Sequence, residues 1–302
     1  MATLSAVIPA TDLRATLGRV VDAIEGARAG PEEVVVVDRP AELGAAAARN
    51  RGAEGAAGDV IVFVDADVEV HEDAFERIRA AFAGDSELAA IFGSYDDEPQ
   101  GGSAVSDFRN LLHHFVHHRG AGPATTFWTG LGAIRREVFL EAGGFDERYR
   151  WLEDVELGMR LRRRGARILL DPTIQGKHLK RWTLLGMLKS DLMHRAVPWL
   201  RLMLENRSLS SALNLSWRDR IATGAAALLA VSLVRRDVRA AAFTTTLVVA
   251  VDAEFYGFLY RRGGLRLLGV GVPLHVAHRI VSVVAVPLAV TAHLLERAPG
   301  RA

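Results

Sequence analysis

Short apolar runs dominated by β-branched residues are the feature that most constrains the fold of this chain. The runs at 34–37 and 60–64 contain no polar residue, and each is followed directly by an aspartate. Continuous runs of this kind are typical of parallel strands that helices cover on both faces. We therefore expect strands at 4–8, 34–37, 60–64 and 88–92, separated by helices at 16–27, 45–54 and 75–82.

This alternation predicts an α/β fold built on a mostly parallel sheet. In open sheets of this type, ligands bind where the carboxyl ends of the strands meet. The pattern breaks at 95–130, which hold an acidic turn, paired glycines and a His-rich helix, and 131–182 resume as compact α+β. We assign 1–182 to one domain.

The character of the chain changes near residue 219. Residues 219–302 hold 10 Arg and 5 Asp or Glu, a net charge of +5, whereas 1–218 carry a net charge of −4. Because the basic end is also the apolar end, its expected partner is membrane lipid rather than nucleic acid. None of its apolar runs is a clean stretch of the ~20 residues that cross a bilayer, so a soluble helical domain is the alternative.

From these runs we predict amphipathic interface helices at 183–218 and a membrane-associated or transmembrane helical region at 219–302. The segment 252–266 mixes aromatic residues with arginines, as interfacial segments do. Its aromatic side chains are expected near lipid headgroups: Phe255, Tyr256, Phe258 and Tyr260.

Two features predict where the first 218 residues reside. The N-terminus has neither a basic region nor a long apolar stretch, so it does not read as a signal peptide. Arginines cluster at the ends of the apolar stretches of the tail, and positive flanks are retained on the cytoplasmic side. We expect a location at the cell membrane, with the 1–182 domain facing the cytoplasm.

The absence of cysteine narrows the possible chemistry. It excludes a disulfide scaffold, a zinc site with Cys ligands, an iron–sulfur cluster and thiol catalysis. The chain also lacks a GxGxxG sequence after a strand, a GxxxxGK[ST] loop, GxSxG and HExxH, so a dinucleotide site of the Rossmann type is not expected. The His pairs at 113–118 lack a nearby carboxylate, and we favour a polar helix there over a metal site.

Asp65 and Asp67 are the strongest single signal of a site. They follow the apolar run at 60–64, so they emerge at the carboxyl end of the expected strand, pointing the same way. Buried carboxylates need partners, and Mg²⁺ or Mn²⁺ is commonly held by one or two carboxylates together with phosphate oxygens. A solvated turn at the end of the strand is the alternative.

Two further segments carry groups that suit a reaction on a phosphorylated substrate. Glu153 and Asp154 begin an expected helix, where a carboxylate can act as a general base, although simple N-terminal helix charge explains them too. Residues 176–182 gather Lys177, His178 and Lys180 with an arginine and a tryptophan, although only three residues of the chain are Lys. Such cations suit a diphosphate and its metal, and a basic surface loop is the alternative.

Taken in order, these segments resemble the family 2 glycosyltransferases with the GT-A fold. The resemblance covers 4–182 and rests on short pieces in a specific order and spacing. The pieces are SAVIPA at 5–10, EVVVVD at 33–38, AARNRG at 47–52, VFVDAD at 62–67, WTGLGAIRR at 128–136, AGGFD at 142–146, Glu153-Asp154 and His178-Leu-Lys-Arg-Trp182.

The resemblance implies an inverting enzyme that uses a UDP- or GDP-sugar as donor and Mn²⁺ or Mg²⁺ as cofactor. It implies Asp154 as the catalytic base and a lipid-linked or membrane-proximal acceptor. The implied residues are Pro9, Asp38, Arg49, Asp65, Lys180 and Arg181 for the nucleotide-sugar, Asp67 and His178 for the metal, and Trp128, Gly130, Glu153 and Trp182 for the acceptor region.

Three departures from the family pattern refine this expectation. Leu13 stands where a glutamate is usual, and Arg39 stands where a second acid usually contacts the base of the donor. His178 replaces the glutamine of the processive synthases, which favours transfer of a single sugar over polymerisation. A catalytically degenerate membrane scaffold is the main alternative. A nucleotidyltransferase is disfavoured, because the first strand is not followed by a glycine-rich basic loop.

Overall fold

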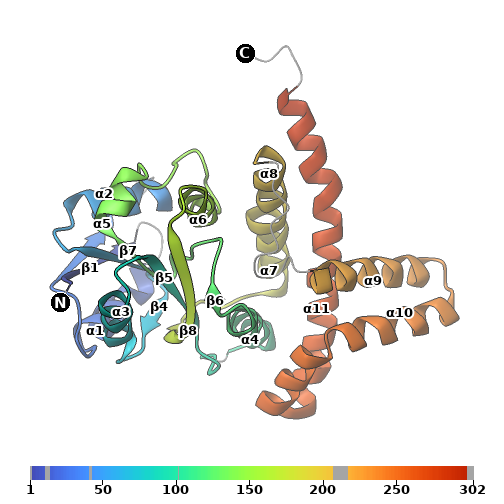
Figure 1. Ribbon diagram of the computed structural model, residues 1–302. Coiled ribbons are helices and arrows are strands. Elements are labelled where there is room, and N and C mark those ends of the chain that lie inside the picture. Colours follow the sequence, from blue (N-terminus) through green and yellow to red (C-terminus); the bar gives the residue numbers. More distant parts are fainter. Residues whose placement is uncertain (1, 11–13, 41–42, 101, 207–216, 298–302) are drawn as a thin grey trace. The chain divides into compact units, whose positions relative to one another are not determined.

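The computed structural model describes residues 2–10, 14–40, 43–100, 102–206 and 217–297 (Figure 1). The chain divides into two compact units. The sheet unit comprises Met1–Gln100 and Val116–Lys180, and the helical unit comprises Gly101–Phe115 and Arg181–Ala302. We expected 101–115 within the 1–182 domain, whereas the structure groups these residues with the helical unit.

The sheet unit is a mixed sheet in which most strands run in one direction. In its described part, the strand order is β2-β1-β3-β7-β5-β8-β4, and β6 pairs with β8. β1, β2, β3, β5 and β8 are parallel to one another, while β4, β6 and β7 run in the opposite direction. The strands are β1 (Leu4–Pro9), β2 (Glu33–Val37), β3 (Val60–Val64), β4 (Val68–Val70), β5 (Leu88–Tyr95), β6 (Gly122–Pro123), β7 (Leu131–Arg135) and β8 (Arg167–His178).

These strands confirm the α/β prediction and its four expected strands. Helices also form where the helical spacing predicts them, at α1, α2 and α3. The helices that belong wholly to this unit are α1 (Arg14–Glu25), α2 (Ala45–Gly55), α3 (Ala74–Gly84), α5 (Arg136–Glu141) and α6 (Glu153–Arg163).

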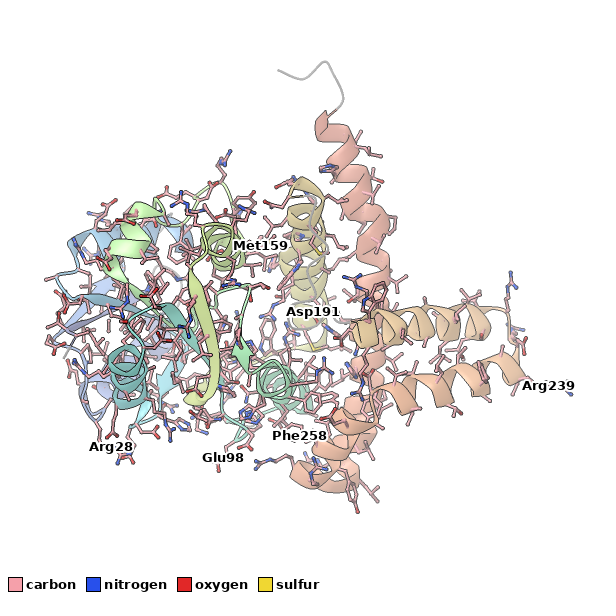
Figure 2. All side chains as sticks on the ribbon, in the orientation of Figure 1. Arg28, Glu98, Met159, Asp191, Arg239 and Phe258 are labelled. Atoms are coloured by element: carbon pink, nitrogen blue, oxygen red, sulfur yellow. The ribbon has the colours of Figure 1, made fainter. Side chains whose placement is uncertain are left out.

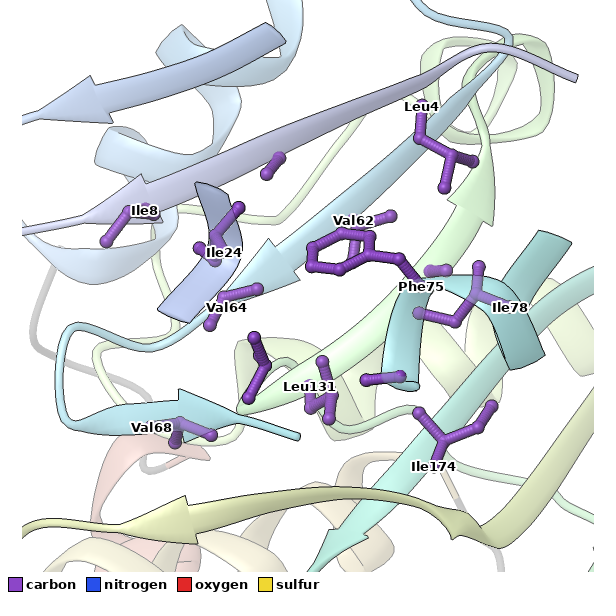
Figure 3. Close-up of a cluster of buried hydrophobic side chains, with 14 of the residues drawn as sticks. Leu4, Ile8, Ile24, Val62, Val64, Val68, Phe75, Ile78, Leu131 and Ile174 are labelled. Carbon is purple, nitrogen blue, oxygen red and sulfur yellow. The ribbon is translucent and has the colours of Figure 1, made fainter. Parts of the chain in front are cut away.

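The core of the sheet unit forms between β3 and the helices of one face (Figure 3). Val62 and Val64 on β3 are fully buried together with Ile24 of α1 and Phe75 of α3. Since every residue of β3 is buried, the aspartates that follow it lie next to the core, at the carboxyl end of this strand. The core therefore fixes where the chain places its first candidate carboxylates.

The helical unit holds α7 (Leu184–Ser190), a π-helical turn η1 (Asp191–Ala196), α8 (Val197–Glu205), α9 (Trp217–Val234), α10 (Val238–Val251) and α11 (Ala253–Arg297). It also includes residues 104–115 of α4 (Ala104–Arg119). α11 is interrupted at Gly263 and Gly264, whose backbone angles are not helical. Among the described residues, the segment Ala253–Leu295 is long and apolar enough to cross a membrane, judged by length and composition.

The aromatic segment at the start of α11 is packed differently from the prediction. Phe255 and Tyr256 are buried, and the Phe255 ring lies 5.1 Å from that of Phe115 in α4. The expectation that these two side chains face lipid headgroups is therefore wrong, because α4 supplies an internal partner. Tyr260 is exposed as expected.

Candidate active site

The aspartates that follow β3 have different partners. Asp65 accepts a hydrogen bond from Arg49 Nη2 at 2.7 Å, whereas the Asp67 carboxylate lies 3.6 Å from His178 Nε2. Residues 65–67 form a turn rather than an extension of the strand, so the alternation of a strand does not apply to them. The expectation that both carboxylates point the same way is therefore wrong.

Arg49 joins two acidic parts of the site. Its guanidinium is buried on α2 and donates to Asp65 Oδ1 at 2.7 Å and to Glu153 Oε1 at 2.5 Å. Burial disfavours its positive charge, but the two carboxylates outweigh that effect and raise the pKa of Arg49. Arg49 thus connects the end of β3 to the start of α6.

Asp67 is a buried carboxylate that stays ionised. Burial opposes its charge, but His178 and Lys180 lower the pKa of Asp67 below its ordinary value. The backbone carbonyl of Asp67 also accepts a hydrogen bond from Leu179 N at 2.8 Å, which ties the turn to the chain beyond β8. The turn thus holds an anionic oxygen next to an imidazole.

Asp67 and His178 fit a divalent cation that is shared with a substrate. Among the described residues, no group of three or more His, Asp or Glu side chains is arranged to hold a metal ion by itself. Mg²⁺ and Mn²⁺ sites of phosphate-binding enzymes commonly have one or two protein ligands, with phosphate oxygens and water completing the coordination. An ionised carboxylate with an adjacent imidazole suits this chemistry.

Asp154 lies at the N-terminus of α6 and is bonded to the segment that follows α4. Its Oδ2 atom accepts hydrogen bonds from the Thr129 backbone N–H and hydroxyl at 3.3 and 3.4 Å. Loss of water around the carboxyl raises the pKa of Asp154, and the charge of Arg49 opposes this effect. A partly buried carboxylate of raised pKa is suited to accept a proton.

Glu153 is more fully enclosed than its neighbour. Burial raises the pKa of Glu153 to about 7, with Arg49 opposing and Asp154 reinforcing the shift. The residue before it, Leu152, has a left-handed backbone with φ 64° and ψ 25°. Non-glycine residues in this conformation are strained, and such strain is often stored next to functional groups.

Two glycines allow the close packing around Asp154. A Cβ atom on Gly158 would lie 2.3 Å from Phe127 N, so only glycine lets α6 approach the backbone that leads to Thr129. A Cβ atom on Gly130 would lie 2.1 Å from the Trp128 ring. Gly158 therefore lets Thr129 reach the base candidate, and Gly130 leaves room for the Trp128 ring.

The side chains of the basic segment at the end of β8 have different partners. Lys177 Nζ contacts Asp96 Oδ2 at 2.7 Å. Burial opposes the charge of the Asp96 carboxyl, but its hydrogen bonds with His71 and Lys177 lower its pKa. His178, the next residue, faces Asp67 instead, because successive side chains of a strand point to opposite faces. Lys180 is exposed and acts on Asp67 through its charge.

The remaining expected site residues lie in several places. Pro9 is buried at the end of β1, and Asp38 follows β2 with a partly exposed side chain. Arg181 and Trp182 belong to the helical unit, where the backbone N–H of Trp182 donates to Ser106 Oγ at 2.8 Å. Within the sheet unit, ion pairs join Arg49 to Asp65 and Glu153, and Asp67 lies next to His178.

The sequence patterns did not single out Tyr95 and Thr129. The Tyr95 ring is stacked on the His178 imidazole, and the Trp128 ring meets Tyr95 edge-on at 5.0 Å. Thr129 could have been found from its place in the WTGLG segment, next to Trp128 and Gly130. No local signal marks Tyr95, which ends β5.

Part of the chain matches a known protein family. Residues 15–143 match the model of Glycosyl transferase family 2. The succinoglycan biosynthesis protein ExoA of Rhizobium meliloti is 30% identical over 189 residues, which are 57% of this chain and 57% of that protein. The pre-mycofactocin glycosyltransferase of Mycobacterium tuberculosis is 28% identical over 146 residues, which are 46% of this chain and 31% of that protein.

A solved structure shares the fold. The mannosyltransferase PcManGT from Pyrobaculum calidifontis, in complex with GDP-Man and Mn²⁺, matches with a TM-score of 0.57 and 15% sequence identity. The match covers 98% of this chain and 88% of that chain. The matches to the curated relatives span just over half of ExoA and about a third of the mycobacterial protein.

Proposed function

We propose that the chain is an inverting glycosyltransferase that transfers a single sugar from a nucleotide-sugar to an acceptor hydroxyl. The match of residues 15–143 to Glycosyl transferase family 2 supports this proposal. The observation that carries the proposal is the arrangement around Asp154. A partly buried carboxylate of raised pKa, bonded to Thr129, lies in the same unit as the Asp67–His178 pair. A base and a diphosphate site are the parts that such a transfer requires.

Asp154 is assigned as the base that accepts the proton of the acceptor hydroxyl. Its raised pKa makes the ionised form a stronger proton acceptor than an ordinary carboxylate. Thr129 orients the carboxylate by donating two hydrogen bonds to Oδ2. The Val155 backbone N–H of the same helix donates to Oδ1 at 2.8 Å. Glu153 is the competitor for this role, but its Oε1 atom is engaged by Arg49.

Asp67, His178 and Lys180 are assigned to the donor diphosphate. When bound by Asp67 and His178, Mn²⁺ or Mg²⁺ supplies neutralisation of the charge on the departing nucleoside diphosphate. The positive charge of Lys180 acts on the Asp67 carboxylate. Lys180 is also exposed, so a phosphate can approach it from solvent. Stabilisation of charge that develops on the leaving group is a large term in this class of reaction.

The remaining donor contacts follow from the ends of neighbouring strands. Pro9 is the last residue of β1, Asp38 follows β2 and Asp65 follows β3. All three therefore lie at the carboxyl edge of parallel strands. We assign them to the nucleoside, with Arg49 holding Asp65 in place. A UDP- or GDP-sugar is the proposed donor, and PcManGT was solved with GDP-Man.

The acceptor is proposed to be lipid-linked and to react at the cytoplasmic face of the cell membrane. Trp128 and Gly130 flank Thr129 in the chain, and Glu153 precedes Asp154, so we assign these three residues to the acceptor side of the base. Support for the membrane comes from the long apolar α11 and from the basic tail. Transfer of a single sugar is supported by His178 in place of a glutamine.

A screen of nucleotide-sugars against the full-length protein tests the proposal. Thermal unfolding is measured with UDP- and GDP-sugars, with and without Mn²⁺, because a ligand at 100 times its Kd adds about 2.7 kcal/mol of stability. We expect one donor to stabilise the protein only when the metal is present. Product from that donor and a polyprenyl-phosphate-linked acceptor is then analysed by NMR for the inverted anomeric configuration.

The same screen separates the proposal from a catalytically degenerate scaffold. A scaffold binds lipid or protein but releases no nucleoside diphosphate from any donor in the presence of acceptor. Stabilisation without transfer, across all acceptors tried, contradicts the enzymatic proposal. ADP-sugars serve as the matched control for non-specific diphosphate binding.

A further inference from the structure

The helical hairpin formed by α9 and α10 has an uncharged body with exposed apolar side chains. No charged residue occurs at 221–234 or at 240–251. The Leu228 and Phe243 side chains are 57% and 70% exposed, and Val231 and Val238 are exposed as well. A helix that borders water normally carries charges on its exposed face, and large exposed apolar patches mark interaction surfaces.

Ser232, Thr244 and Thr246 of the hairpin each donate a hydroxyl hydrogen bond within their own helix. Ser232 donates to the Leu228 carbonyl at 2.8 Å, and Thr244 donates to the Ala240 carbonyl at 2.7 Å. Thr246 likewise bonds the carbonyl of the preceding turn at 3.0 Å. Hydrocarbon offers no hydrogen-bond partner, so a helix immersed in lipid must satisfy its polar groups internally in this way.

The tip of the hairpin is a defined turn that carries three arginines. The Asp237 N–H donates to the Ser232 carbonyl at 3.0 Å, and Arg236 has a left-handed φ of 55°. The Asp237 carboxylate then caps α10 by accepting from the backbone N–H groups of Arg239 and Ala240. Arg235, Arg236 and Arg239 are all exposed, and Figure 2 shows Arg239 at the outer end of the hairpin.

One arginine of α11 holds both ends of the hairpin at its base. Arg279 Nη2 contacts Asp219 Oδ1 at 3.1 Å and Asp252 Oδ1 at 2.8 Å. Asp219 lies in the first turn of α9 and Asp252 follows α10, and all three residues are buried. The base is therefore an internal ionic cluster, while the positive charge at the tip faces outward.

α11 differs from the hairpin although it is the longer apolar helix. Its middle carries His278 and Arg279, and His278 Nδ1 lies 2.8 Å from the buried Asp191 carboxylate of η1 (labelled in Figure 2). That part of α11 is thus bonded to polar partners inside the unit. The hairpin has no such polar partner along its described body, which favours it as the lipid-facing element.

Building on the proposed membrane association, we propose that the α9–α10 hairpin inserts into the bilayer and that its tip arginines bind phosphate groups of anionic phospholipids. Each uncharged body measures about 20 Å at 1.5 Å per residue. This is less than the ~30 Å of a hydrocarbon core, so the hairpin inserts without crossing it, and its arginine side chains reach the headgroups of the cytoplasmic leaflet. Arginines at this position are placed at phosphates because they are costly in hydrocarbon.

Vesicle flotation of the full-length protein tests the role of the arginines. The triple variant R235Q/R236Q/R239Q should bind vesicles of phosphatidylglycerol and phosphatidylcholine roughly 100-fold more weakly, with little change on pure phosphatidylcholine. The matched control R28Q/R51Q/R163Q removes the same charge from the sheet unit and should bind as the native protein does. Equal losses in both variants would show a net-charge effect and overturn the proposal.

Lipid quenching tests insertion, and the absence of cysteine makes the labelling specific. An environment-sensitive fluorophore on Phe243→Cys should be quenched by nitroxide-labelled acyl chains, whereas the same fluorophore on Glu54→Cys should not. An unquenched label at 243 overturns the proposal. A dimer that buries this position in lipid-free solution also overturns it and shows that a second copy of the chain covers the hairpin. Neither assay requires sugar transfer, so failure here leaves the proposed enzymatic function intact.

Discussion

The Tyr95 ring is stacked on the His178 imidazole, with ring centroids 4.2 Å apart and planes 8° from parallel. His178 in turn faces the Asp67 carboxylate, and the Trp128 ring contacts the tyrosine edge-on. The tyrosine therefore fixes the plane of the imidazole that we assign to the metal. Groups behind a metal ligand set its orientation and tune its affinity.

Replacement of Tyr95 tests this positioning role. Tyr95→Leu should weaken Mn²⁺ binding in the presence of UDP or GDP by about tenfold, because the imidazole loses the flat surface that holds it. Tyr95→Phe should retain native affinity, since stacking does not use the hydroxyl. Calorimetry of metal binding distinguishes them, and equal behaviour of the two variants contradicts the role.

Asp67 should be essential for metal-dependent nucleotide binding. Asp67→Ala removes the ionised carboxylate next to His178, so Mn²⁺ should no longer increase the affinity for UDP or GDP. Glu69→Ala, two residues away on β4, is the matched control and should keep the metal effect. Unchanged nucleotide affinity of Asp67→Ala, with and without Mn²⁺, would rule out the metal assignment.

Asp154→Asn should separate chemistry from binding. The amide keeps the shape of the side chain but cannot accept the proton, so transfer should fall by roughly 10²–10⁴ while donor binding survives. Single-turnover rates and donor affinity are measured on the same preparation. If donor affinity collapses as well, Asp154 is a binding or structural residue, and Glu153→Gln then becomes the informative variant.

Glu153 should make stability depend on pH in a defined direction. Its carboxyl has an ordinary pKa of 4.5 and a pKa of about 7 in the folded state, so the folded protein binds more protons between these values. The contribution of this group to the free energy of unfolding should therefore be fully present below pH 4.5 and be lost as the pH rises through 7, by about 3 kcal/mol.

The variant Glu153→Gln isolates that contribution. The decline in unfolding free energy between pH 5 and pH 8 should be smaller in Glu153→Gln than in the native protein. Glu141→Gln changes an exposed carboxyl at the end of α5 and should leave the decline unchanged. Denaturant titrations at several pH values provide the comparison, and parallel curves for all three proteins would contradict the expectation.

The local pattern of the sequence determined the repeating elements of the sheet unit. Uninterrupted runs at 34–37 and 60–64 formed the strands β2 and β3. β3 is buried along its whole length, which leaves no place for polar side chains, whereas β2 is only partly buried. The same runs located Asp38 and Asp65, since a residue that follows a buried strand lies at the end of the sheet. The helix that begins with Glu153 and Asp154 was also predictable from local spacing.

Tertiary structure alone decided the strand order and the partners within the site. β7 pairs antiparallel between β3 and β5, and β4 has only three residues, too few for a periodic signal. Arg49 meets Asp65 and Glu153 across 16 and 104 residues of chain. Sequence patterns report which face of an element is buried, but such pairings depend on how distant elements pack, which local propensity does not encode.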